Sequence, residues 1–109
     1  SLGYNASNSF TINSSQDQIV TVLAVPDTTI MSDIIYVGVY TTSGKLIALS
    51  NSNSYINYVE FTAPKGSYVV KITKSALSLS SAYRLYVTGS YTYLNQYYIH
   101  GGYIKTAKL

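Results

Sequence analysis

Side chains able to do acid–base or nucleophilic chemistry are few in this chain of 109 residues. It has four carboxylates, one histidine and no cysteine, namely Asp17, Asp27, Asp33, Glu60 and His100. A hydroxyl nucleophile needs a base and a group that orients that base, and a glycosidase needs two carboxylates at a matched distance across a cleft. Each acid lies beside an expected turn or on the polar face of an expected strand, and the histidine lies in an expected turn. We therefore predict that the chain is not an enzyme.

Asp27 and Asp33, six positions apart, are the candidates for metal ligands. With backbone carbonyls and the hydroxyls of Thr28 or Ser32 they would make a weak calcium site, because calcium takes about six to eight oxygen ligands, several of them carboxylate. The alternative is that Asp27 caps a turn and Asp33 begins a strand, and we favour it because two carboxylates are few for calcium. No other cofactor is predicted, and a single histidine cannot make a multi-histidine site within one chain.

Two sequons, Asn5-Ala6-Ser7 and Asn13-Ser14-Ser15, make Asn5 and Asn13 candidates for N-glycosylation in a secreted protein. Such triplets also arise by chance in a sequence rich in Asn and Ser.

The net charge of +3 comes from basic residues that are spread along the sequence rather than clustered. Because so small and scattered a charge would release few phosphate counterions on binding, we predict no nucleic-acid partner.

Apolar and polar residues alternate with a period of two, and no sustained helical stripe is present. Tyr68, Val70 and Ile72, for example, are expected on one face of a strand. Strands are expected over residues 9–12, 18–25, 34–40, 45–50, 58–62, 67–73 and 83–88, turns over 26–29, 42–44, 51–54 and 64–66, and a short helical turn over 75–82. This pattern predicts an all-β, antiparallel β-sandwich of jelly-roll type, in a single domain over residues 1–109.

The predicted core covers about residues 8–90, and residues 91–109 form a separate segment with five of the thirteen tyrosines. Two interpretations of this segment stay open. One is a final hairpin that turns at Gly101–Gly102 and covers a sheet edge, and we favour it because a Gly-Gly pair suits a local turn. The other is a donor strand that completes the sheet of a neighbouring subunit through backbone hydrogen bonds.

Four segments occur in an order that is typical of one protein family. An Asp opens the apolar strand in 32–40, a Ser-Gly turn begins 43–50, a Pro-x-Gly-x-Tyr turn leads into the strand of 63–72, and a last alternating strand covers 83–87. This order resembles the bacterial and archaeal pre-peptidase C-terminal domain, a relative of the jelly-roll domains of thermophilic subtilisin-like proteases, over about residues 8–90. The resemblance implies a non-catalytic β-sandwich attached to a secreted hydrolase, where it aids stability, maturation or substrate contact. The family often holds calcium with several Asp residues, whereas the candidate loop here offers only Asp27 and Asp33.

Composition indicates where such a protein would work. The chain has thirteen tyrosines, no tryptophan and four acids, and it is rich in Ser, Thr and Asn. Acid unfolds proteins mainly by protonating carboxylates that are paired in the fold, so we expect this chain to tolerate acid. We expect an extracellular or cell-surface protein that is thermostable and archaeal, although used sequons would fit a eukaryotic protein as well as an archaeal one. Membrane insertion is not expected, because the longest uncharged apolar run, Ile34 to Tyr40, is too short to span.

The expected function is that of a non-catalytic accessory domain of a secreted hydrolase, and a protease is the class of hydrolase that we favour. It would contribute stability or bind a surface or substrate, and its partner would be the parent catalytic domain. The alternative is a self-assembling subunit of an extracellular filament, pilus or surface layer. Its partners would be identical subunits, joined by donor-strand exchange.

Overall fold

The computed structural model describes residues 6–26, 34–50, 57–75, 83–91, 95–99 and 105–109. These residues form nine strands: β1 (Ala6–Ser14), β2 (Gln18–Pro26), β3 (Ile34–Thr41), β4 (Leu46–Leu49), β5 (Asn57–Ala63), β6 (Gly66–Ser75), β7 (Tyr83–Thr88), β8 (Asn95–Ile99) and β9 (Thr106–Lys108). Valine, isoleucine, tyrosine and threonine are frequent in them, and these residues fit a pleated, half-buried surface. In β5 buried and exposed residues alternate without exception.

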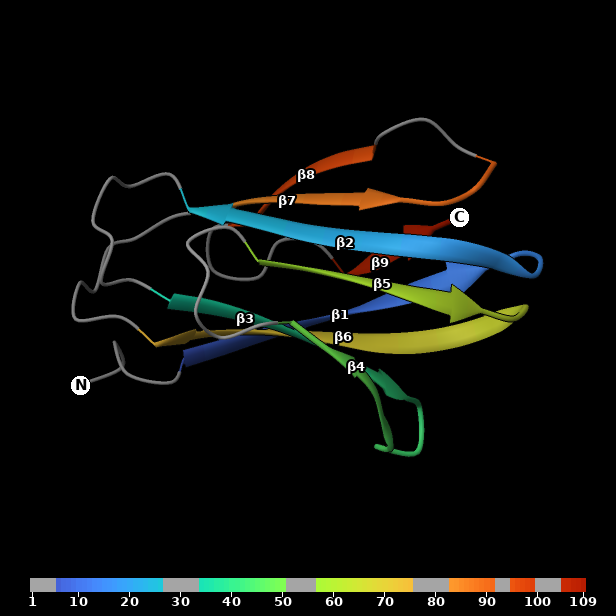
Figure 1. The fold of residues 1–109 in the computed structure, drawn as a ribbon, viewed down its shortest axis with the longest axis horizontal. Helices are drawn as coiled ribbons and strands as arrows, with labels where there is room; N and C mark the ends of the chain where they lie inside the picture. Colours follow the sequence, from blue (N-terminus) through green and yellow to red (C-terminus); the bar gives the residue numbers. More distant parts are fainter. Residues whose placement is uncertain (1–5, 27–33, 51–56, 76–82, 92–94, 100–104) are drawn as a thin grey trace.

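The strands make two sheets that pack face to face (Figure 1). Sheet A has five strands in the order β4-β3-β6-β1-β9, and sheet B has four in the order β5-β2-β7-β8. Neighbouring strands are antiparallel throughout, except that β9 runs parallel to β1. The prediction of an all-β, antiparallel sandwich is therefore confirmed, with one parallel pair at an edge of sheet A.

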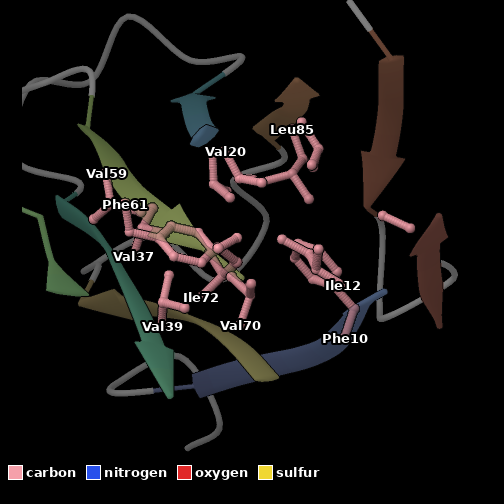
Figure 2. Close-up of a cluster of buried hydrophobic side chains, with 14 of the residues drawn as sticks. Phe10, Ile12, Val20, Val37, Val39, Val59, Phe61, Val70, Ile72 and Leu85 are labelled. Carbon is pink, nitrogen blue, oxygen red and sulfur yellow. The ribbon is translucent and has the colours of Figure 1, made fainter. Parts of the chain in front are cut away.

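The hydrophobic core lies between the sheets, where side chains from both inner faces point toward one another (Figure 2). Sheet A contributes Phe10, Ile12, Val37, Val39, Val70, Ile72 and Ala107, and sheet B contributes Val20, Val22, Ala24, Val59, Phe61, Ala63, Leu85 and Val87. Leu109, just beyond β9, is also in the core, which therefore reaches past residue 90. Burying a residue of this size stabilises the fold by roughly 1.5–3 kcal/mol, so this layer dominates stability.

Two expected turns are present. In the β3–β4 hairpin, the Gly44 backbone N–H donates to the Thr41 carbonyl at 3.0 Å, and Gly44 has a φ of 97°. Gly66, which enters β6, has a φ of 150°. Both values lie where side chains with a Cβ are strained, which is why glycine occurs at these two positions.

All seven expected strands are found, several with shifted ends, and β8 and β9 lie within residues 91–109. β1 begins at Ala6 rather than at residue 9. The expected turns over 26–29 and 51–54 lie wholly or mostly outside the described residues, as does nearly all of the helical turn over 75–82. Ser75 is the last residue of β6.

The segment 91–109 contributes to both sheets. β8 pairs with β7 in sheet B, and β9 pairs with β1 in sheet A. The described strands on either side of Gly101–Gly102 are therefore not neighbours in one sheet, which differs from the favoured hairpin. The glycine pair itself lies outside the described residues.

Candidate functional site

Most of the residues predicted to do chemistry lie where the structure does not describe them. Asn5, Asp27, Asp33 and His100 are outside the described residues, so glycosylation at Asn5 stays a prediction, and neither the weak calcium site nor its favoured alternative is tested. Within the described ranges, no group of three or more His, Cys, Asp or Glu side chains is placed to hold a metal ion. In the same ranges no helix is long and apolar enough to cross a membrane.

The two described acids, Asp17 and Glu60, have different surroundings. Asp17 Oδ1 accepts a hydrogen bond from the backbone N–H of Lys65 at 2.9 Å, which joins the turn after β1 to the turn before β6. Glu60 is exposed on the outer face of β5, opposite Thr21 of β2. Asp17 therefore connects two turns through a hydrogen bond, and Glu60 is an exposed surface residue.

Asn13, the other glycosylation candidate, lies in β1 between β6 and β9. It is opposite Ser67 on one side and Lys108 on the other. Its Oδ1 accepts a hydrogen bond from the Ser67 hydroxyl at 2.8 Å. The side chain therefore ties β1 to β6, and its glycosylation stays a prediction.

The outer face of sheet A carries mainly polar and basic side chains. Ser9, Thr11, Thr73, Thr106 and Lys108 all point outward there, because their strand neighbours are buried in the core. The hydroxyls and the ammonium group make this face compatible with water. Exposed apolar area on this sheet is concentrated at its edge strand β4, where Leu46 and Leu49 are 48% and 59% exposed.

A shallow hollow of about 270 Å³ interrupts this face near the β3–β4 hairpin. Tyr40, Thr41, Val69 and Lys71 are among its lining residues. The Lys71 Nζ lies 5.5 Å from the centre of the Tyr40 ring, within range of a cation–π attraction. The hollow is open and formed by strand side chains, and its lysine already contacts the ring.

The same tyrosine covers a glycine in the middle of β3. A Cβ added to Gly38 would lie 3.0 Å from Tyr40 Cε1 and 3.1 Å from its hydroxyl oxygen. The ring therefore occupies the space above Gly38 and shields backbone that would otherwise be open. This arrangement explains Tyr40 as a structural residue of sheet A, where an aromatic side chain compensates for a glycine.

On the outer face of sheet B, large apolar and aromatic side chains lie over the interior strands β2 and β7 as well as the edge strand β5. Leu23 of β2 is opposite Tyr58 of β5 on one side and Tyr86 of β7 on the other, so the three residues form a row across three strands. Tyr58 is 61% exposed and Ile19, on the same face of β2, is 51% exposed. We call Ile19, Leu23, Tyr58 and Tyr86 the tyrosine face.

Few charges border the tyrosine face. Glu60 lies two residues from Tyr58 on β5, and Arg84 lies two residues from Tyr86 on β7. Thr21, Thr62 and Thr88 supply hydroxyls between the apolar residues. A weakly charged surface of this kind can stack rings against a partner while the phenol groups keep contact with water.

Sequence reasoning identified exposed tyrosines as a class but not this row. Each member occupies an outward position in its own strand, which alternation predicts. That β2 lies between β5 and β7 is a long-range fact, and no local signal in the sequence shows it.

Comparison with family models, with curated proteins and with solved structures gives no match to this chain. The structure shows an all-β domain of two packed sheets.

Proposed function

We propose that this chain is a non-catalytic accessory module of a secreted hydrolase, a protease in the first instance, and that it binds a surface or substrate through the tyrosine face. The observation that carries the proposal is the row of exposed Tyr58 and half-buried Leu23 and Tyr86 on the outer face of sheet B. The resemblance of residues 8–90 to the pre-peptidase C-terminal domain supports the same role.

The physical case rests on what the row offers a partner. Tyrosine rings bring a large contact area with few rotatable bonds, so little conformational entropy is lost on binding. The strands beneath hold the rings in place, and β2 and β7 are both interior strands of sheet B. A polymer or protein surface with flat apolar patches would match this arrangement better than a small charged ligand would.

Adsorption to insoluble particles tests this role. The purified chain is mixed with elastin, cellulose and chitin particles, and the unbound fraction is measured. We expect retention on at least one, and about tenfold weaker binding for Tyr58→Ser/Tyr86→Ser, because each lost ring contact is worth roughly 0.5–1.5 kcal/mol.

Tyr36→Ser is the matched control, since Tyr36 is a half-buried tyrosine on the outer face of sheet A. It should leave adsorption unchanged. An equal loss in this control, or no adsorption to any particle, would contradict the proposal.

A second candidate function is a self-assembling extracellular subunit, and one specific feature favours it. β9 adds to the edge of sheet A in parallel with β1, and it comes from the segment that follows β8 of sheet B. An edge strand carried on such a segment is the kind of element that can be donated to a neighbouring copy. Sedimentation separates the two candidates: an accessory module stays monomeric, and a subunit forms large assemblies.

A further inference from the structure

The β1 edge of sheet A binds an extended segment through its backbone. The Thr11 N–H donates to the Lys105 carbonyl at 2.9 Å, and the Leu109 N–H donates to the Asn13 carbonyl at 2.8 Å. Between these two bonds, Thr11, Ile12 and Asn13 align with Thr106, Ala107 and Lys108. Backbone pairing of this kind does not depend on the side chains of the bound segment.

Side chains where β1 leads into β2, which belongs to the other sheet, hold the end of the segment. The Leu109 carbonyl accepts hydrogen bonds from Ser15 Oγ at 3.0 Å and from Gln18 Nε2 at 3.1 Å. Gln18 is itself buried, and its Nε2 also donates to Ser14 Oγ at 3.0 Å. We call the β1 edge from Thr11 to Asn13, together with Ser15 and Gln18, the acceptor groove.

The acceptor groove selects two side chains of its occupant. Ala107 is fully buried and Leu109 is 7% exposed, while Lys105, Thr106 and Lys108 are exposed. A segment with a small residue and, two positions later, a leucine therefore fits. Gln18 Oε1 is buried and has no hydrogen-bond partner within the described part of the chain, so the groove offers one more acceptor than residues 105–109 use.

We propose that the acceptor groove also binds residues 105–109 of a second copy, in place of its own segment. This proposal deepens the second candidate function and rests on it. The hydrogen bonds to residues 105–109 come from β1, from Ser15 and from Gln18 at the start of β2, so none of them depends on the covalent path between donor and groove. β9 is held by a short, parallel pairing: three aligned residues join it to β1, as many as join β4 to β3 and against nine between β1 and β6. A short parallel pairing at an edge is the one that opens most readily.

Crosslinking between full-length copies tests this exchange, because the chain has no cysteine of its own. Thr11 and Thr106 are register partners with side chains on the outer face, so T11C and T106C place two thiols side by side. T11C and a mass-tagged T106C are co-refolded and treated with a short bismaleimide. We expect a T11C–T106C heterodimer in about tenfold or greater excess over the control pair, because strand binding raises the local thiol concentration.

T62C is the control partner for T11C, since Thr62 is exposed on the outer face of sheet B. The double variant T11C/T106C reports whether the two thiols are within reach in one copy. A heterodimer yield equal to that of the control pair, with the double variant crosslinked within one chain, would overturn the exchange. Heterodimers without larger assemblies would keep the exchange and remove the filament role, since two copies can swap strands reciprocally and close.

Discussion

On the outer face of sheet A, exposed leucines lie only on the edge strand β4 within the described residues, and polar side chains cover much of β1, β6 and β9. On the outer face of sheet B, aromatic and aliphatic side chains extend over the interior strands β2 and β7. Asn13 bonds to Ser67, and the Tyr40 ring lies between Gly38 and Lys71. The row of Tyr58, Leu23 and Tyr86 differs because it crosses three neighbouring strands, with Tyr58 61% exposed at its edge. Tyrosine therefore has two roles in one sandwich.

The contrast shows that residue type alone does not indicate a binding surface. Tyr40 and Tyr86 are both half-buried tyrosines on outer faces. The first has a glycine beneath it that requires a cover and lies opposite Leu46 of the edge strand β4. The second has Leu23 of the interior strand β2 beside it. What distinguishes them is the neighbour on the same face of the sheet, which the strand order decides.

The largest effect that separates inner from outer positions is expected on β7. Leu85 is fully buried between the sheets, and Tyr86, the next residue, points outward. Leu85→Ala should lower the free energy of unfolding by about 2–5 kcal/mol through lost burial and a cavity. Tyr86→Ser should lower it by about 1 kcal/mol or less. Urea denaturation followed by circular dichroism measures both, and equal losses would show that Tyr86 is a core residue rather than part of a binding face.

A smaller effect is expected at the covered glycine of sheet A. Gly38→Ala would bring a methyl group to 3.0–3.3 Å from the Tyr40 ring, so the ring must move. We expect a loss of about 1–3 kcal/mol in unfolding free energy from this overpacking. In a Tyr40→Ser background the obstruction is gone, and Gly38→Ala should be nearly neutral. A double-mutant cycle measures the coupling, and additive effects would refute the covering role of Tyr40.

Alternation predicted the burial of Val70, Ile72 and Leu85, because a period of two is a local property of the chain. Strand order is not local, so the sequence did not reveal that Leu23 lies between Tyr58 and Tyr86. The C-terminal segment shows the same limit. The Gly101–Gly102 pair favours a local hairpin, yet β8 and β9 pair with different sheets and Ala107 is buried beside β1.

The smallest expected effect lies where the two sheets meet, at Tyr68 of β6. Its ring packs edge-on against the ring of Phe61 of sheet B, with 5.5 Å between the ring centres. Its hydroxyl donates a hydrogen bond to the Pro64 carbonyl at 2.7 Å. Burial, and secondarily the negative charge of Asp17, raise the pKa of Tyr68 above its ordinary value of 10.0. Folding therefore favours the neutral phenol over the phenolate.

The sign of the pH dependence follows from that shift. The stability from neutral Tyr68 is fully present below the unfolded pKa of 10.0 and is lost as the pH rises through the higher folded pKa. Tyr68→Phe removes the ionisation and also the hydrogen bond to Pro64, at a cost of about 1 kcal/mol near neutral pH. The difference in unfolding free energy between the wild type and this variant should therefore shrink from about pH 9 to about pH 11, measured by urea titration at each pH. Because the difference cancels the ionisation of the other tyrosines and of the lysines, a constant value over that range would mean that Tyr68 titrates alike in the folded and unfolded chains.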